Sequence, residues 1–520
     1  MSKVIFSIRK NTYYDSVKLM LISNDVKKIE GVHEALVGMG TDLNKELSEN
    51  LNLLTDEIKD LGPNDFFITV LADDNVEIQT IVEEADRLLK PKSADSDSDY
   101  MPPTLNSALE SNPESNIAII SVAWEYAADE ARNALNKGLH VMIFSDNVKV
   151  EDERSLKELA VSKGLLMMGP DCGTAIINNI PLAFANVIKK GKIGIVGASG
   201  TGIQEATVLI DKLGEGVSQV IGTGGRDLSL EVGGLMMLQG LEALVEDPET
   251  EVILLISKPP AKEVEEKILA KVKESKKPVV VSFIGGEKEL IEKHGGVSAI
   301  SLEDAARKAV ALLKGEEVKD FDGFTMAMDE IEKIVNQETN KLGKDQKYLR
   351  AMYTGGTLAD ECMKLLSPVI GDMYSNIPLT PEYKLKDVFK SQEHTCVDYG
   401  DDDFTKGRPH PMIDPSIRVE QLAVEAKDDN IAVVLLDFVL GYGAHKDPVE
   451  DMAEAIKKAK SLKESKGEHL IVIASVCGTE NDPQDLLESE RRLKEAGVIV
   501  MPSNAQAVRL SGLIINKISK

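Results

Sequence analysis

Cysteine is scarce in this sequence, and long apolar runs are missing. The 520 residues include 4 cysteines, which lie far apart and form no CxxC pair: Cys172, Cys362, Cys396 and Cys477. This spacing excludes a disulfide framework and a thiolate zinc site, and it favours a reducing, cytoplasmic location. The first residues, MSKVIFSIRK, lack the apolar core of a signal peptide, and no stretch approaches the roughly 18 uncharged residues of a membrane span. We therefore expect a soluble cytoplasmic protein.

Positive charge is scarce as well. The 60 Lys and Arg residues face 87 Asp and Glu residues, which gives a formal net charge of −27. Such a field repels nucleic acid and anionic membranes, so we expect neither as a partner. We expect small anionic metabolites instead, and any phosphorylated one must be held by local devices such as helix starts or a few cations.

Short apolar runs alternate with longer stretches of helical period along the whole chain. Runs such as VIFSI, FFITVL and IAIISV indicate buried strands, and the charged stretches between them indicate crossover helices. This alternation predicts an α/β protein with parallel sheets. The predicted organisation is a first domain at 1–190, a second at 191–314, a charged linker at 315–347 and a third domain at 348–520.

The second and third domains resemble copies of one another. Four segments correspond in order and character: 199–214 with 355–368, 221–229 with 397–405, 251–269 with 430–456, and 277–286 with 468–478. Any two parallel-sheet domains share the alternation, so chance similarity stays open at this point. The glycine turn at the same place in both copies favours a true duplication.

That glycine turn is the first candidate site. In IGIVGASGTGIQE a strand meets a glycine-rich turn and a helix then begins, which is a typical anion-binding arrangement. The alternative is that small residues only tighten the turn. The predicted phosphate-binding residues are Ser199, Gly200, Thr201 and Gly202, with Gly355, Gly356 and Thr357 as their counterparts in the third domain.

Three named motifs can be tested on the same turn. A Walker loop fails because no lysine follows Gly202, and a nucleophile elbow fails because Thr201 stands where its second glycine should be. A dinucleotide fingerprint survives only loosely, because another glycine turn precedes Asp227 where a lone ribose-binding acid is expected.

Four basic side chains on strand-end loops are the candidate catalytic residues. Arg226 stands beside three glycines, and Lys258 follows a strand, where ligands sit on open parallel sheets. Arg408 and His410 lie in a proline-bounded loop that limits their freedom and suits a site where oxyanion charge develops. A surface salt bridge for the arginine, and a histidine satisfied by carboxylates, are the alternatives.

Two further residues invite a chemical role but have plainer explanations. Cys172 has no histidine close in sequence, so we expect a structural thiol. His294 lies in a loop, where an exposed histidine is the simplest reading and a phosphorylated one is conceivable. We predict no metal-ligand set.

Together, SGTGIQE, GTGGRDLS, GGTLADE and GRPHPMIDP make the chain resemble the succinyl-CoA synthetase superfamily, and within it the FdrA proteins. The resemblance covers nearly the whole chain. It implies a Rossmann-like N-terminal domain, similar to a CoA-binding domain, followed by two flavodoxin-like ligase-type domains with parallel sheets.

The resemblance also implies a function. FdrA-like proteins are associated with allantoin and purine breakdown, which implies a component of oxamate carbamoyltransferase that converts oxalurate and phosphate into oxamate and carbamoyl phosphate. Companion protein subunits and a homo-oligomer are implied partners, with phosphate or carbamoyl phosphate as substrate.

Departures from the synthetase pattern keep other functions open. The turn SIRKNTYYDS has no glycine fingerprint for CoA, no nucleotide-grasp domain precedes residue 350, and the phosphohistidine motif is missing around His294. CoA and ATP are therefore doubtful ligands. The alternatives are a component of an ADP-forming acyl-CoA synthetase and a non-catalytic phosphate-sensing scaffold.

Overall fold

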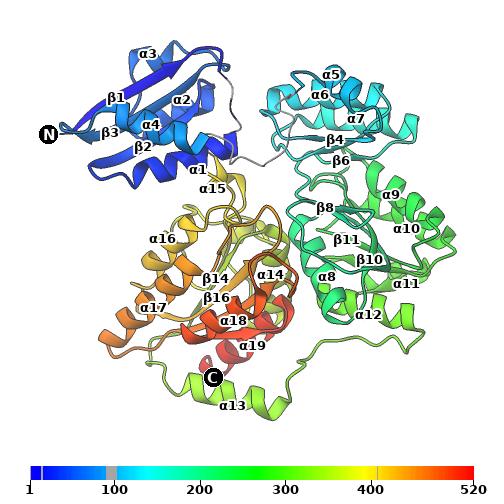
Figure 1. Ribbon diagram of the computed structural model, residues 1–520. Coiled ribbons are helices and arrows are strands. Elements are labelled where there is room, and N and C mark those ends of the chain that lie inside the picture. The colour runs from blue at the N-terminus through cyan, green and yellow to red at the C-terminus, as the bar shows by residue number, and fades with distance from the viewer. Residues whose placement is uncertain (1, 13, 15, 90–101, 407) are drawn as a thin grey trace. The chain divides into compact units, whose positions relative to one another are not determined.

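A computed structural model describes every residue except 1, 13, 15, 90–101 and 407 (Figure 1). Contacts divide the chain into two compact units. The first comprises residues 1–115 with the short segments 121–126 and 405–409, and the second comprises the rest. Within the described residues, no helix is long and apolar enough to cross a membrane.

An antiparallel sheet of three strands, in the order β1-β3-β2, forms the centre of the first unit. The strands are β1 (Ser2–Arg9), β2 (Val32–Met39) and β3 (Phe66–Asp73), and the helices are α1 (Ser16–Lys27), α2 (Asp42–Asn50), α3 (Asp56–Lys59), α4 (Ile78–Leu89) and α5 (Leu105–Ser111). The central strand β3 is buried on both faces, because its run FFITV supplies apolar side chains to each side. This half of the predicted 1–190 domain is therefore not a parallel Rossmann-like layer.

A small parallel sheet, in the order β4-β5-β6, holds the middle of the predicted first domain and belongs to the second unit. Its strands are β4 (Ile117–Ile120), β5 (His140–Ile143) and β6 (Met167–Met168), connected by α6 (Trp124–Asn136) and α7 (Val150–Lys163). The strands of the predicted first domain thus belong to three different sheets. The direction and the partner of a strand are set by distant contacts rather than by its own apolar pattern.

Seven strands form the next sheet, in the order β13-β12-β11-β9-β10-β7-β8. The strands are β7 (Thr174–Ile177), β8 (Ile180–Ala183), β9 (Lys190–Gly197), β10 (Val217–Gly222), β11 (Val252–Ser257), β12 (Val279–Phe283) and β13 (Val297–Ser298). Helices α8 (Gly200–Lys212) and α12 (Leu302–Lys314) pack together, and α9 (Leu235–Glu246) packs with α10 (Lys262–Glu274). The short α11 (Lys288–Lys293) precedes β13. The hairpin β7–β8 joins antiparallel and lies before the predicted boundary at residue 190.

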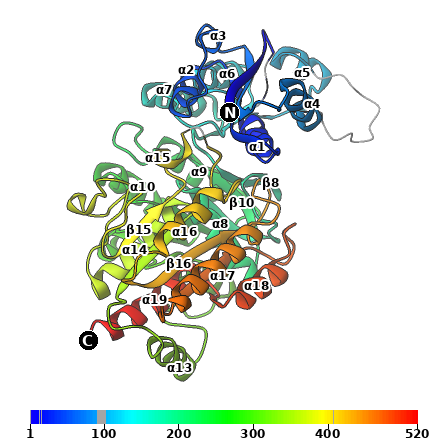
Figure 2. The same cartoon turned by 90° about the vertical axis from the view of Figure 1, so that its left-hand side faces the viewer.

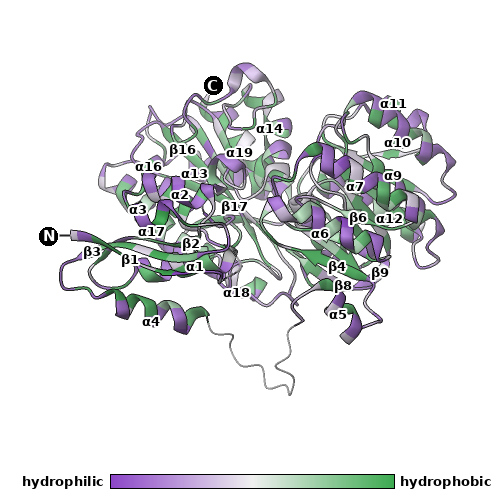
Figure 3. Ribbon diagram, turned by 90° about the horizontal axis from the view of Figure 1, so that it is seen from above, coloured by the Kyte–Doolittle hydropathy of each residue, from purple (hydrophilic) through white to green (hydrophobic). Residues whose placement is uncertain are grey.

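The last sheet has five parallel strands in the order β15-β14-β16-β17-β18 (Figure 2). They are β14 (Tyr348–Tyr353), β15 (Thr395–Asp398), β16 (Ile431–Val439), β17 (Ile471–Cys477) and β18 (Val498–Met501). The helices are α14 (Gly356–Ile370), α15 (Asp402–Thr405), α16 (Ser416–Glu425), α17 (Glu450–Ser465), α18 (Leu486–Glu495) and α19 (Asn504–Ile518). In Figure 3 the strands are mainly green and the helices carry both colours, which matches sheets that are buried between helical layers.

Strand order confirms the duplication. The order β13-β12-β11-β9-β10 in one copy corresponds to β18-β17-β16-β14-β15 in the other, and the first copy adds β7 and β8 beyond β10. In both copies the first strand leads directly into the helix of the glycine turn. A shared order of parallel strands is far more specific than alternation alone.

The two copies also exchange helix caps across their interface. Glu205 stands six residues after Ser199, and its carboxylate accepts the backbone N–H of Asn504, the first residue of α19, at 2.9 Å. Glu361 stands six residues after Gly355 and accepts the N–H of Leu302, the first residue of α12, at 2.7 Å. Each copy therefore caps the last helix of the other.

Residues 315–347, predicted as a linker, form an ordered strap. Its helix α13 (Met328–Thr339) buries Ile331 completely. Its Phe321 ring lies under two equivalent arginines, with the guanidinium carbon of Arg307 at 3.9 Å and that of Arg509 at 5.9 Å from the ring centroid. Both arginines follow their N-cap serines by six residues, so Phe321 marks the place where the two copies meet symmetrically.

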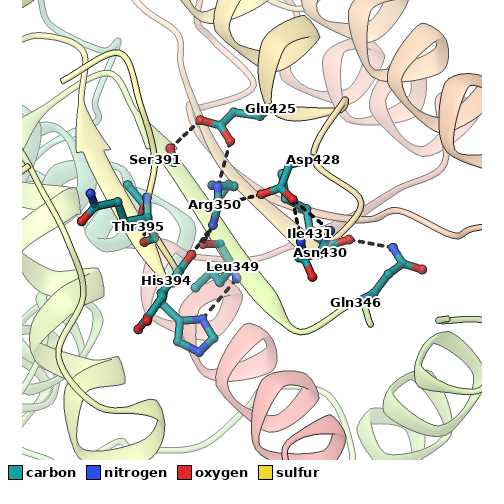
Figure 4. Close-up of polar contacts among 12 residues, drawn as sticks. Gln346, Leu349, Arg350, Ser391, His394, Thr395, Glu425, Asp428, Asn430 and Ile431 are labelled. Carbon is teal, nitrogen blue, oxygen red and sulfur yellow. Dashed lines mark hydrogen bonds and ion pairs between the residues drawn. The ribbon is translucent and has the colours of Figure 1, made fainter. Parts of the chain in front are cut away.

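A buried arginine fixes the beginning of β15 (Figure 4). Arg350 on β14 donates to Glu425 and to Asp428, each at 2.8 Å. Its guanidinium also reaches the backbone carbonyl of Glu393, just before β15. Because the parallel neighbour β15 is thereby held in place at its start, the residue at its far end, Asp398, has a defined position.

Candidate functional site

The starts of α8 and α14 touch. The hydroxyls of Ser199 and Thr357 lie 2.5 Å apart, so either can donate to the other, and Ser199 also accepts the N–H of Gly202 at 3.0 Å. A methyl group on Gly355 would overlap with Thr201, the residue equivalent to Thr357. The predicted phosphate-binding residues of both copies are therefore brought together.

The hydroxyl residues are closed off, while the first glycine of each helix is not. Ser199, Thr201 and Thr357 are buried, whereas Gly200 and Gly356 are partly exposed. The N-cap of α14, Gly355, provides no side chain to cap the first amides of that helix. An anion would therefore bind over the two glycines, with the hydroxyls behind them, rather than between the two threonines.

Lys258 lies directly beside Gly356. It follows β11, and its ammonium is 3.7 Å from the carboxylate of Asp360 on α14. A methyl group on Gly356 would come within 2.5 Å of this ammonium and within 2.7 Å of the carboxylate of Asp398. Burial lowers the pKa of Lys258, but the surrounding aspartates raise it above its usual value, so the side chain stays a cation.

Asp398, at the end of β15, was missed by the sequence predictions. The residue is 5% exposed, and its Oδ1 accepts the N–H of Gly400 at 2.9 Å. Asn376 holds its backbone through two hydrogen bonds of 3.0 Å. Burial raises the pKa of Asp398 to about 7, against the opposing charge of Lys258. A carboxyl group that changes charge near neutral pH, beside a lysine, is typical of acid–base chemistry.

His410 borders the same place as a neutral ring. Its Nδ1 accepts the N–H of Met412 at 3.2 Å, and its ring stacks at a tilt on Phe184 with 5.7 Å between centroids. Burial lowers the pKa of His410 to about 4. Since Nδ1 is an acceptor, the ring proton is on Nε2, which faces Gly400. His410 can donate a hydrogen bond there, but it carries no positive charge at neutral pH.

Arg226 holds elements together. Its guanidinium donates to the carbonyl of Val148 at 2.6 Å and pairs with Glu153 at 2.9 Å. The fully buried Lys157 bridges Glu153 at 2.8 Å and Asp227 at 2.9 Å. This network fastens α7 to the loop after β10. Asp227, weighed above as a nucleotide-binding acid, is a buried structural partner, and a role for Arg226 in binding ligand stays a prediction.

The remaining candidate residues lie on other segments of the chain. Arg408 belongs to the segment 405–409 of the first unit, so its role stays a prediction. His294 ends α11, and its Nδ1 lies 2.8 Å from the carbonyl of Leu290. Cys172 is buried, which raises its pKa to about 12, so its thiol stays protonated and structural.

Asp171, next to that cysteine, adds a further carboxylate. It lies in the turn between β6 and β7, with a positive φ of 54°. Loss of hydration among surrounding protein atoms and the nearby charge of Asp146 raise its pKa to about 6, while Lys258 and Arg226 lower it. Lys258 thus has several acids around it, namely Asp171, Asp360, Asp398 and Asp401.

Two sheets that share one order of parallel strands, and whose glycine-started helices meet, define a protein of the succinyl-CoA synthetase type. The family models agree: the CoA-ligase model matches residues 352–514, and the CoA binding domain model matches 188–285. A third model, described as AllF, heavy metal-associated domain, matches residues 1–102. The chain belongs to the FdrA family of succinyl-CoA synthetase-like proteins.

The chain is also similar to individual proteins. The chain is 46% identical over 510 residues to the uncharacterized protein YahF of Escherichia coli, covering 98% of each chain. It is 32% identical to the alpha subunit of an ADP-forming succinate–CoA ligase of Aquifex aeolicus, over 35% of this chain and 61% of that subunit. A solved acetyl-coenzyme A synthetase of Korarchaeum cryptofilum aligns with 77% of this chain and 83% of its own at 15% identity, with a TM-score of 0.32.

The ligand suggested by the heavy metal-associated model does not fit the residues present. Residues 1–102 contain no cysteine, and the described residues hold no group of three His, Cys, Asp or Glu side chains that could bind a metal. We therefore assign no heavy metal to this chain.

Proposed function

We propose that the chain is the phosphate-handling component of an oxamate carbamoyltransferase, which converts oxalurate and phosphate into oxamate and carbamoyl phosphate. The observation that supports this most is the position of Lys258. Its ammonium stands against Gly356, at the uncapped start of α14, where α8 also begins. One fixed cation and two helix starts suit a single phosphoryl group.

Catalysis would consist mainly of positioning. A phosphate oxygen attacks the carbamoyl carbon of oxalurate, and the bond from that carbon to the oxamate nitrogen breaks. Lys258 and the first amides of α8 and α14 would hold the phosphate, and the Nε2–H of His410 would donate to the developing oxyanion. Arg226 is proposed to attract the oxamate carboxylate, and a catalytic role is proposed for Arg408. No covalent enzyme intermediate is needed.

The proposal includes partners and excludes cofactors. Companion subunits would complete the enzyme, in a cytoplasmic homo-oligomer, and neither ATP nor CoA takes part. The strongly acidic chain makes its local anion site salt-sensitive, since every carboxylate near Lys258 weakens phosphate binding.

The test is phosphorolysis of oxalurate by the full chain, alone and with its co-expressed companions, with carbamoyl phosphate as the measured product. We expect turnover by the complex, reduced at least tenfold by Ser199→Ala combined with Thr357→Val. Turnover that is unchanged in this double variant would favour the phosphate-sensing scaffold. An absence of turnover in every assembly would overturn the transferase.

A second candidate is a component of an ADP-forming acyl-CoA synthetase. The matches to the CoA-ligase and CoA binding domain models favour it. Isothermal titration of the chain with CoA would test it: micromolar binding that Lys258→Met weakens would revive this function, and no binding would exclude it.

A further inference from the structure

The proposed transfer needs a group that moves one proton. When the carbamoyl carbon of oxalurate exchanges its bond to nitrogen for a bond to phosphate oxygen, the departing oxamate nitrogen must gain a proton. Hydrogen phosphate loses one as it becomes carbamoyl phosphate. The reaction therefore shifts a single proton from the phosphate to the nitrogen, and nothing is oxidised or reduced.

One carboxyl group stands where such a proton would pass. The Oδ2 atom of Asp398 lies against Gly356 beside the ammonium of Lys258, at the place proposed for phosphate. Its Oδ1 atom is fixed by the N–H of Gly400. The other oxygen is thus oriented toward the start of α14 by a buried and doubly held residue.

The charged groups around Asp398 come from three elements. Lys258 on the loop after β11 favours the carboxylate, whereas Asp360 on α14 and Asp401 in the following turn favour the acid. His410, on the other side of Gly400, is neutral. The balance lets Asp398 exist in both forms near neutral pH, as a proton carrier must.

We propose that Asp398 is the general acid and base of the transfer. The carboxylic acid of Asp398 gives its proton to the oxamate nitrogen as the carbon–nitrogen bond breaks. The resulting carboxylate then takes the proton of the phosphoryl group, which returns the enzyme to its starting form. This inference rests on the proposed transferase function.

Other residues nearby are less suited to this step. The Nδ1 atom of His410 is engaged with Met412, which leaves only a donor at Nε2. Asp360 pairs with the same lysine at 3.7 Å. Asp398 has its Oδ2 atom beside the position of a methyl group on Gly356, and its Oδ1 atom accepts the N–H of Gly400.

The experiment compares two carbamoyl donors and two variants in the full complex. Oxalurate has a leaving nitrogen that needs a proton, whereas p-nitrophenyl carbamate has a leaving phenolate that needs none. Asp398→Asn keeps the shape but cannot carry a proton, and Asp360→Asn removes a carboxylate from the same lysine. Phosphorolysis of each donor is measured from pH 5.5 to 9, and thermal unfolding shows whether each variant is folded.

We expect Asp398→Asn to lower the rate with oxalurate about 100-fold or more, and the rate with p-nitrophenyl carbamate less than about fivefold. Wild-type activity with oxalurate should fall as the pH rises past about 7, because the acid form is lost. Asp360→Asn should keep this decline but move it to lower pH, because the charge of Asp360 favours the acid form of Asp398. Equal losses with both donors, or a folded Asp398→Asn variant with unchanged oxalurate turnover, would overturn the role of Asp398 alone. A wild-type complex without oxalurate turnover would overturn the transferase itself.

Discussion

The last residue of the second strand has a different role in each of the two copies. Gly222 ends β10 opposite Gly197, and Asp398 ends β15 opposite Tyr353, so the two residues are equivalent. At Gly222 the backbone of Thr174 and the thiol of Cys172 leave no space for a side chain. At Asp398 the strand is at the edge of its sheet, and a carboxyl group occupies the space.

This difference shows how a duplicated fold divides its tasks. The additional hairpin β7–β8 covers the end of β10. The loop after β10 is fastened to α7 through Lys157, Arg226 and their buried partners. The end of β15 instead holds the buried carboxyl group of Asp398, beside Lys258 and Gly356. A similar division holds one strand further on, where Lys258 of the first copy corresponds to the buried Val439 of the second.

The largest effect on stability should come from removing Lys157, which links α7 to the loop after β10. Lys157→Met leaves Glu153 and Asp227 buried without their shared cation, and we expect a loss of about 3–5 kcal/mol in the free energy of unfolding. The activity per folded molecule should persist. Chemical denaturation measures the loss, with Lys163→Met on the exposed end of α7 as the control. A Lys157→Met protein of wild-type stability would contradict the fastening role.

Removing the charge of Lys258 should lower the activity and change the stability little, which is the reverse of the result expected for Lys157→Met. Lys258→Met deletes the charge proposed to hold phosphate, and we expect a rate loss of about 100- to 1,000-fold, which is about 3–4 kcal/mol in the activation barrier. The side chain is 40% exposed, so stability should change little. Steady-state kinetics beside Lys262→Met, at the exposed start of α10, provides the test. If Lys258→Met lowered stability instead of activity, Lys258 would have a structural role rather than a catalytic one.

Two equivalent glycines sharpen the comparison between the helix starts. A methyl group on Gly356 meets the ammonium of Lys258 and the carboxylate of Asp398, whereas one on Gly200 makes only ordinary contacts, with the hydroxyl of Thr174 at 3.5 Å and the Cα of Gly173 at 4.0 Å. Gly356→Ala should therefore slow turnover about 10- to 100-fold by displacing both side chains, and Gly200→Ala should cost much less. Neither should unfold the protein, because alanine favours a helix. Equal losses would mean that the two starts contribute alike.

The smallest effect is expected on the pH dependence of stability, through Glu361, which caps a helix of the other copy. Burial raises the pKa of Glu361 to about 7, so the folded state binds a proton that the unfolded state releases above about pH 4.5. This contribution stabilises the protein below that pH and is lost as the pH rises to about 7. Glu361→Gln should therefore reduce the loss of stability between pH 5 and 8 by about 1–2 kcal/mol, measured as the difference from wild type. Parallel pH curves for the two proteins would contradict this prediction, and Glu205→Gln should act in the same direction.

Much of the duplicated fold could be read from the sequence. The corresponding segments 251–269 and 430–456 contain β11 and β16, the segments 277–286 and 468–478 contain β12 and β17, and the paired glycine turns stand at equivalent strand ends. The antiparallel sheet of the first unit could not be read, because FFITVL has the same apolar pattern whichever way its neighbours run. The hairpin at 174–183 was missed since its strands are only 4 residues each.

The site was only half predictable. The glycines, Ser199, Thr357 and Lys258 follow strand ends that local pattern reveals, so their meeting could be inferred from the duplication. Asp398 was hidden in the acidic run DYGDDDF, which looks like a solvated loop, although its place at the end of an apolar strand was a usable signal. The engagement of Arg226 depends on Glu153, which is distant in sequence and could not be foreseen.

The strap around Phe321 affects whether the two copies stay paired at low protein concentration. Both copies belong to one chain and are joined through residues 315–347. A short covalent tether keeps the second copy at an effective concentration in the millimolar range, whatever the amount of protein in the cell. The pairing of the halves is thus independent of abundance, and a single proteolytic nick in the strap would make it depend on abundance.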